Sequence, residues 1–153
     1  MIAVLQRVLR AAVTADGAPS GRCGQGYMIL LGVLNGDGEK DALLLAEKIA
    51  KLRVFTDPAG KMNLSVTDIG GSALIISNFT LAADYSHGNR PSFLAAAAPG
   101  TAQPLYETFT EALRRHIPVE TGVFGADMQI DMTADGPVTI MLDSHVLAGG
   151  RAV

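Results

Sequence analysis

An almost unbroken apolar run, YMILLGVL, extends from Tyr27 to Leu34. The run is too short to cross a membrane, and Gly26 on one side and Asn35-Gly36 on the other are turn-forming residues. A short apolar run between turn signals is typical of a strand that is buried on both faces. We therefore expect a central strand here, with the hydrophobic core built around it.

Two amphipathic helices are expected to cover this core. From Glu39 to about Phe55, apolar residues recur at helical spacing, and the same spacing recurs from Pro104 to Ile117, where Pro118 ends the pattern. A second strand-like run, Ser72 to Ser77, follows the turn signal Gly70-Gly71. It delivers the segment Ser77 to Leu81 at its end.

The two ends of the chain carry further strand patterns. The N-terminal part predicts two strands joined by a short turn, and the C-terminal part predicts a hairpin around the turn Ala134-Asp135-Gly136-Pro137. The strands are Met1 to Val8, Ala11 to Ala15, Phe124 to Met132 and Val138 to Leu142, with turns at Asp16-Gly17, Pro19-Ser20-Gly21 and Asp57-Pro58-Ala59-Gly60. This order of elements predicts an α/β or α+β fold with a curved, largely antiparallel, barrel-like sheet and two main helices.

Length and composition limit the organisation of the chain. Its 153 residues suit one domain, and 48% hydrophobic with 18% charged residues is typical of a compact globular protein. We expect that domain to occupy residues 1–143, followed by a frayed C-terminal tail over residues 144–153.

Charge and targeting signals bear on partners and location. A net charge of −3 argues against general, charge-driven binding of nucleic acid. No stretch is long and apolar enough for a membrane span, and arginines interrupt the start of the chain where a signal peptide would have its apolar core. These features predict a cytoplasmic protein without a membrane partner.

Familiar catalytic motifs do not stand out. The sequence has no G-x-S-x-G, Walker or H-E-x-x-H pattern, and His87, His116 and His145 are widely scattered, so we expect neither a metal nor another cofactor. The single cysteine, Cys23, has no neighbouring histidine and is interpreted as an inert small residue. A triad of Ser77, His87 and Asp84 is an alternative that the sequence does not support, because triads are recognised by a geometry that it does not provide.

Two polar segments remain in apolar surroundings. One is Ser77-Asn78-Phe79-Thr80-Leu81 after a buried strand, and the other is Asp135-Gly136-Pro137-Val138-Thr139 before one. Polar residues at strand ends are where sites usually lie. The same residues also serve as ordinary turns, and composition alone favours that simpler interpretation.

Several dispersed segments carry a family resemblance, which favours a functional site over ordinary turns at these residues. They are MIAVLQRVLRAAV at the start, RVFTDPAGKMNLSV from Arg53, SNFTLAAD from Ser77, RPSF from Arg90, and TGVFGADMQI followed by DGPVTI. In this order and spacing they resemble the D-aminoacyl-tRNA deacylase family, from Met1 to about Leu142. Several motifs in register are more specific than any one of them.

The resemblance implies a homodimer whose pocket binds the aminoacylated 3′ adenosine of tRNA. Ser77, Asn78, Phe79 and Thr80 would form the catalytic segment. In the partner's chain, Gly136 and Pro137, joined by a cis bond, would exclude the side chain of an L-amino acid. Arg7 would brace the Pro loop of the other subunit, and Met128 would line the adenine pocket.

The implied reaction is hydrolysis of D-aminoacyl-tRNA, with glycine mischarged on alanine tRNA as a possible second substrate. The terminal 2′-hydroxyl of the tRNA would assist attack by water, and the backbone N–H groups of Phe79 and Thr80 would stabilise the oxyanion. Thr80 has no apparent partner base, so the resemblance favours it as a positioning residue over a nucleophile.

Two positions depart from the family pattern. Asn78 replaces a glutamine, and Ala134 replaces an asparagine two residues before the Gly-Pro pair. A shorter amide reaches a different partner, so efficiency and chiral stringency are the properties most exposed to change. A deacylase of relaxed chirality and a catalytically weak module that binds tRNA ends are the alternatives.

Overall fold

The structure, a computed structural model, describes residues 1–149. Three α-helices and one short 3-10 helix accompany eight strands in this part of the chain. The strands are β1 (Ile2–Ala15), β2 (Ala18–Cys23), β3 (Gly26–Gly32), β4 (Arg53–Thr56), β5 (Met62–Ser65), β6 (Ser72–Ser77), β7 (Val119–Thr121) and β8 (Met128–Asp143). The helices are α1 (Glu39–Lys51), η1 (Phe79–Ala82), α2 (Pro99–Arg114) and α3 (Ser144–Leu147).

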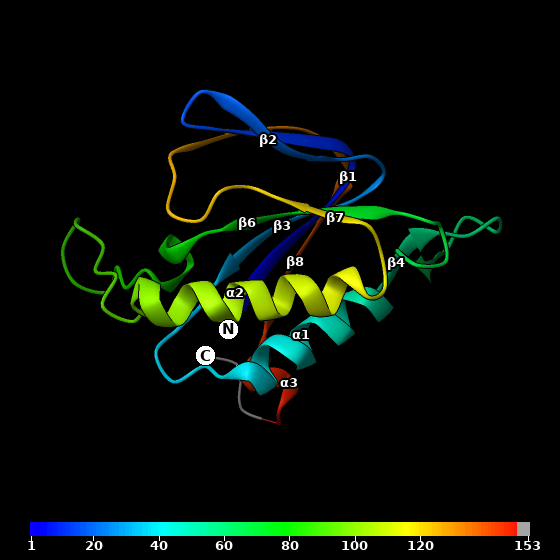
Figure 1. Cartoon of the computed structure of the whole chain (residues 1–153). Coiled ribbons are helices and arrows are strands. Elements are labelled where there is room, and N and C mark those ends of the chain that lie inside the picture. Colours follow the sequence, from blue (N-terminus) through cyan, green and yellow to red (C-terminus); the bar gives the residue numbers. More distant parts are fainter. Residues whose placement is uncertain (150–153) are drawn as a thin grey trace.

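Six strands form one curved sheet, in the order β2-β1-β3-β6-β7 with β8 on the free edge of β1. All pairs that involve β1 are antiparallel, whereas β3 pairs with β6, and β6 with β7, in parallel. Helices α1 and α2 lie side by side over one face of this sheet (Figure 1). The predicted α+β class with a curved, barrel-like sheet is confirmed.

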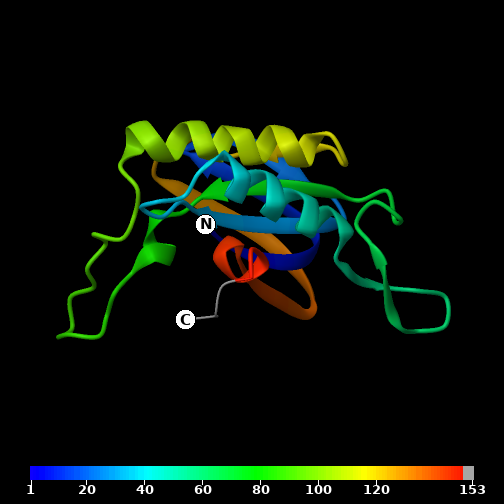
Figure 2. The same cartoon turned by 90° about the horizontal axis from the view of Figure 1, so that it is seen from below.

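Strand β3 is the centre of the sheet, as the apolar run predicts. Every residue from Gly26 to Gly32 is buried except Leu30, which is half-buried. Tyr27, Ile29 and Leu31 point into the larger core, which the two helices close from their side (Figure 2). Met28 packs into a second core on the opposite face, where β8 and β2 curl over the sheet.

Both helices are amphipathic, but their ends differ from the prediction. Helix α1 stops at Lys51 because the chain turns extended at Leu52 and continues as β4, so the predicted extension to Phe55 is wrong. Helix α2 begins at Pro99, before the predicted start at Pro104, and runs through that proline. Ala102 is buried in the core, and this burial stabilises the additional first turn of the helix.

The N-terminal segment is one strand and not two. Strand β1 pairs with β3 up to Val8 and with β2 from Ala11 onward, while β8 follows its other edge along almost the whole length. Leu9 and Arg10 are exposed at the point where β2 replaces β3 as the neighbour of β1. Their exposure explains the break in the apolar pattern of the sequence. The predicted turn at Asp16-Gly17 is confirmed, but Pro19, Ser20 and Gly21 belong to β2.

The predicted C-terminal hairpin is also wrong. Strand β8 runs continuously antiparallel to β1, pairing Gln6 with Thr139 and Val8 with Ala134. Residues 135–138 thus face only Arg7 and form a bulge in β8, because both halves of the strand bind the same neighbour. We call residues 135–138 the Pro bulge.

The segment after residue 143 does not fray at its start. Ser144–Leu147 form α3, and the Ser144 N–H donates to the carbonyl oxygen of Met1 over 2.9 Å. Residues 150–153 of the predicted tail lie outside the described residues, and the domain boundary at residue 143 stays a prediction. None of the helices within residues 1–149 is both long and apolar enough for a membrane span.

Candidate active site

The first polar segment leaves the sheet at the end of β6. The Asn78 N–H donates to the Leu31 carbonyl oxygen over 2.8 Å, which extends the parallel pairing with β3 by one step. A Cβ on Gly32 would approach the Asn78 carbonyl oxygen to 3.0 Å, so the glycine permits this close packing. The segment is thereby fixed to the most buried strand of the fold.

Asn78 then caps the 3-10 helix η1. Its Oδ1 accepts hydrogen bonds from the Thr80 N–H at 3.1 Å and from the Thr80 hydroxyl at 2.5 Å. The Thr80 hydroxyl donates its proton in this contact and keeps its lone pairs for another donor. The Thr80 N–H is likewise engaged, whereas the Phe79 N–H, at the start of the helix, has no acceptor within the turn.

A cavity of about 770 Å³ opens beside this segment. Ser77, Asn78 and Phe79 line one side of it, and Met128, from the start of β8, lines another. Aromatic rings complete the wall: Phe79 meets Phe93 edge to face, with ring centroids 5.2 Å apart. Its size and apolar walls with polar groups at one edge suit a small organic ligand.

Tyr106 anchors the cavity wall on the side of helix α2. Its hydroxyl donates to the Ile75 carbonyl oxygen over 2.9 Å, and burial raises the pKa of this tyrosine to about 12. The phenol is therefore neutral near pH 7 and is committed to the backbone of β6. This makes Tyr106 a structural support of the wall.

The second polar segment, the Pro bulge, lies elsewhere on the chain. The Gly136-Pro137 bond is cis, as the resemblance implies. Arg7 holds the bulge by its Nε, which donates to the Asp135 carbonyl oxygen and pairs with its carboxylate, both at 3.1 Å. Arg7 Nη1 donates to Val54 over 2.6 Å. This brace lies within one chain, whereas the resemblance implied one between subunits.

The structure thus divides the predicted site residues into two groups. Ser77, Asn78, Phe79 and Met128 line one cavity, with Thr80 bonded to Asn78 beside it. Gly136 and Pro137 belong to the Pro bulge, which Arg7 braces, and none of these three residues lines that cavity. One chain therefore presents the two groups at separate places.

The other residues considered from the sequence form no catalytic group within the described part of the chain. His87 Nδ1 contacts the neighbouring Ser86 hydroxyl in an exposed loop, and among residues 1–149 no hydrogen bond joins it to Ser77 or Asp84. Cys23 is buried, and burial raises the pKa of its thiol, which agrees with an inert residue. His116 pairs with Glu47 of helix α1 at 3.0 Å.

One polar cluster escaped the sequence analysis. Asp37, Asp41 and His145 come together around the α-amino group of Met1. The spacing of Asp37 and Asp41 at the start of a helix was visible, but their partners arrive from the two ends of the chain. No local pattern signals such a meeting.

The curved α+β sheet with a polar-edged cavity defines the class of a small ligand-binding or catalytic domain. The comparisons with known proteins are more specific. The model of the D-Tyr-tRNA(Tyr) deacylase family matches residues 4–143, and this chain belongs to that family.

Individual relatives agree with the assignment. The chain is 55% identical to a D-aminoacyl-tRNA deacylase of Thermomicrobium roseum, covering 98% of each chain. It is 58% identical to a protein of the same name from Deinococcus deserti, covering 94% of this chain and 99% of the relative. A solved structure, the c-Myc DNA Unwinding Element Binding Protein, superimposes with a TM-score of 0.88 at 40% identity, over 94% of this chain and 98% of that one.

Proposed function

We propose that this protein hydrolyses D-aminoacyl-tRNA to a free D-amino acid and tRNA, as a cytoplasmic homodimer that proofreads chirality. The family assignment supports the reaction, because the named relatives are D-aminoacyl-tRNA deacylases. The observation that carries the dimeric site is the separation of the cavity from the Pro bulge. A second copy would bring its own bulge to the cavity of the first.

Exposed apolar side chains support association of two copies. Phe79, beside the cavity, is 60% exposed, and Met141, on β8, is 74% exposed. Ile130 on the same strand is also exposed. Exposed apolar side chains favour a partner surface, and a two-fold dimer covers the same groups on both copies.

In the proposed reaction, water attacks the ester carbonyl and the bond to the ribose oxygen breaks. The 2′-hydroxyl of the tRNA assists the attack, and the leaving ribose oxygen takes up a proton. The Phe79 N–H is the open donor for the developing oxyanion. The Thr80 N–H takes part only if it leaves Asn78, so Phe79 carries more of this role than the resemblance alone implied.

Thr80 would position the substrate. Its hydroxyl donates to Asn78, so its lone pairs face any incoming donor, such as the α-ammonium group of the amino acid. This use requires no activated hydroxyl, which suits the absence of a base beside Thr80 in the described residues. Ser77 and Met128 would shape the cavity on either side.

Chiral selection would come from Gly136 and Pro137 of the partner's chain. Their backbone carbonyls would occupy the space that an L side chain needs, while D-amino acids and glycine remain acceptable. Glycine mischarged on alanine tRNA is therefore a possible second substrate. The tRNA would be gripped locally at its 3′ end, since the net charge is −3.

The decisive experiment compares hydrolysis of D-Tyr-tRNA with that of L-Tyr-tRNA by the purified protein, with Pro137→Ala as a parallel variant. Loss of the D ester alone supports the proposal. Cleavage of both esters favours a deacylase of relaxed chirality, and binding of tRNA without cleavage favours an end-binding module.

The shared site has its own test, in which two inactive variants are mixed. A variant with Phe79→Pro, which removes the backbone N–H, and Thr80→Ala is combined with one altered at Gly136. If each site takes its cavity from one copy and its bulge from the other, the mixed dimer has one intact site and activity returns. Two inactive proteins that stay inactive after subunit exchange contradict a shared site.

A further inference from the structure

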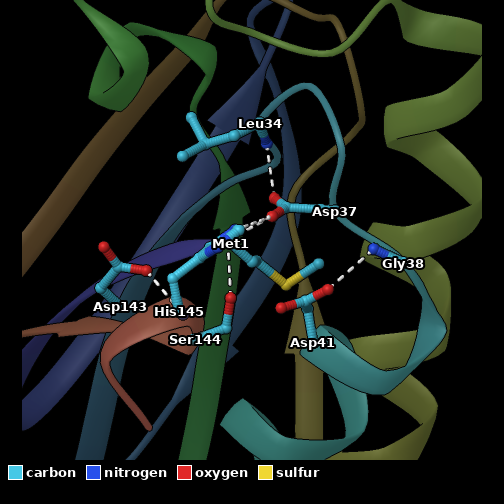
Figure 3. Close-up of polar contacts among 8 residues, drawn as sticks. All are labelled: Met1, Leu34, Asp37, Gly38, Asp41, Asp143, Ser144 and His145. Atoms are coloured by element: carbon cyan, nitrogen blue, oxygen red, sulfur yellow. Dashed lines mark hydrogen bonds and ion pairs between the residues drawn. The ribbon is translucent and has the colours of Figure 1, made fainter. Parts of the chain in front are cut away.

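The α-ammonium group of Met1 lies in a closed polar site between the first strand and the last helix. It donates to Asp37 Oδ1 over 2.6 Å and to the Ser144 hydroxyl over 2.8 Å (Figure 3). The side chains of Met1 and Asp37 are both 0% exposed, and so is Ser144. A charged nitrogen and its counterion are thus both removed from water.

The site connects four parts of the fold. The second oxygen of Asp37 accepts from the Leu34 N–H at 2.6 Å, two residues beyond the end of the central strand. His145 Nε2 of helix α3 contacts Asp37 Oδ1 at 3.0 Å, and Asp41 Oδ2 accepts from the Gly38 N–H at 2.9 Å, where α1 begins. Figure 3 shows these side chains converging on Met1.

Charge holds this cluster together. Burial acts to raise the pKa of Asp41, but the hydrogen bond from Gly38, the nearby Ser144 hydroxyl and the positive charges of Met1 and His145 lower it overall. Among residues 1–149, Asp37 contacts no other permanent cation, because His145 is charged only when protonated. A buried carboxylate that loses its cation is strongly destabilising.

An acyl group on the Met1 nitrogen would remove that cation. A free ammonium has three N–H donors and a positive charge, whereas an amide nitrogen has one donor and no charge. One donor cannot serve both Asp37 and Ser144, and the acyl group needs volume where Met1 is fully enclosed. The site therefore distinguishes a free amine from a blocked one.

We propose that Asp37, Ser144 and the start of α3 form a receptor for the free α-ammonium group of Met1, which makes N-terminal processing a condition for the stable fold. Where synthesis begins with N-formylmethionine, as in bacteria, the formyl group must be removed by a deformylating hydrolase. Water cleaves the formamide C–N bond, its oxygen leaves in formate, and the freed amine takes up a proton. Met1 itself must stay, since its side chain belongs to the core.

The test compares the chain carrying a free amine at Met1 with the same chain formylated there, each with and without Asp37→Asn. We expect formylation to lower the Tm by roughly 10 °C in the unchanged chain, and to have little further effect in Asp37→Asn. Asp41→Asn is the matched control: it removes a carboxylate from the cluster that does not contact the Met1 nitrogen, so the effect of formylation should persist. Equal Tm values for free and formylated chains would overturn the proposal.

The chemical reactivity of the Met1 amine tests the proposal even if Asp37→Asn does not fold. The Met1 amine of the native protein should react with an acylating reagent about 100-fold more slowly than that of the urea-unfolded chain. Ser144→Ala should raise the native rate, and Thr108→Ala, at a half-buried position on α2 outside the cluster, should not. Reaction of the native amine at the rate of the unfolded chain overturns the proposal. Neither readout involves deacylation, so failure here and failure of the proposed function are distinguishable.

The same experiments separate an ammonium site from a metal site. The ligand atoms of Asp37, Asp41 and His145 lie within 4.8 Å of one another, a spacing that a divalent cation could also use. Met1 already fills that space with its charge. If Zn²⁺ raises the Tm of the free-amine chain in proportion to its concentration, the ammonium is not the resident cation and the proposal is wrong.

Discussion

The two segments of the proposed site are held by the protein in opposite ways. The segment 77–82 is tied to the central strand at its start, where the Asn78 N–H donates to the Leu31 carbonyl oxygen, and it ends in the buried Ala82. The Pro bulge depends on one side chain, Arg7, which is 11% exposed and reaches a 35% exposed Asp135. The cavity edge thus shares the stability of the core, whereas the bulge is positioned separately. Substitutions in the bulge should alter activity more than stability.

Gly136→Ala should produce the largest loss of activity relative to its loss of stability. Gly136 has φ of +140°, and an added Cβ would lie 2.4 Å from the Val138 nitrogen, so the bulge must move. A displacement of about 1 Å at a reacting centre costs on the order of 100-fold in rate. We expect D-Tyr-tRNA hydrolysis to fall by at least this factor while the Tm changes by only a few degrees.

Gly24→Ala is the matched control for this variant, because no described atom beyond its own chain neighbours lies within 4 Å of the added Cβ. It should leave both hydrolysis and Tm near those of the unchanged protein. A Gly136→Ala protein that unfolds broadly, with a large loss of Tm, would show that the bulge belongs to the core after all.

Arg7→Ala should have the next largest effect. It removes the hydrogen bonds to Asp135 and Val54, so the bulge loses its brace and β4 loses a contact. We expect roughly a tenfold loss of hydrolysis and a loss of about 2 kcal/mol in the free energy of unfolding, measured in urea.

Asp135→Asn tests which contact of Arg7 braces the bulge, since it removes the negative charge of the side chain and keeps the backbone carbonyl oxygen that Arg7 binds. A small effect would assign the brace to the backbone, and an effect as large as that of Arg7→Ala would assign it to the ion pair.

Asn78→Ala tests the cavity edge. The substitution removes the cap of η1 and the acceptor of the Thr80 hydroxyl, so we expect a loss of about 1 kcal/mol in unfolding free energy. Hydrolysis should fall severalfold, because Thr80 is no longer oriented. Asn78→Ser keeps a capping oxygen and should recover most of the stability. An unchanged rate of hydrolysis in Asn78→Ala would show that the orientation of Thr80 by Asn78 does not contribute to catalysis.

The smallest expected effect is on stability at alkaline pH, and it arises from Tyr106, a residue of the cavity wall. The pKa of Tyr106 is raised to about 12 by burial, above its ordinary value near 10, so the unfolded chain loses this proton first. Its contribution to stability is complete below pH 10 and is lost as the pH rises from 10 to 12, about 1 kcal/mol at pH 11.

Tyr106→Phe should flatten the unfolding free energy in this pH range. Burial also raises the pKa of Tyr27, so part of the alkaline slope must remain in the variant. If the whole slope persists, Tyr106 ionises as freely in the folded protein as in the unfolded chain.

The sequence predicted the elements whose signals are local. The run from Tyr27 to Leu34 is dense enough to require burial on both faces, and β3 has it. Helical spacing located α1 and α2, although their ends depend on what packs beside them. For the candidate site, the family resemblance supplied the residues, because Ser77 to Thr80 also read as a simple turn.

Features set by distant pairing could not be predicted. The apolar pattern breaks at Leu9 because β3 gives way to β2 as the neighbour of β1, and no residue near Leu9 records that exchange. A Gly-Pro pair between two strands indicates a hairpin unless both strands share one partner, as the halves of β8 do. The Met1 cluster escaped notice for the same reason.

The pairing of β1 with β8 also bears on how the protein is made. Ile2 pairs with Asp143, so the first strand to leave the ribosome waits for nearly the whole chain before its outer edge is covered. Contacts between such distant residues slow folding, and until β8 arrives β1 exposes an open edge that can pair with other chains. Synthesis rate and chaperone supply, more than intrinsic stability, should therefore govern how much of this protein reaches its native state.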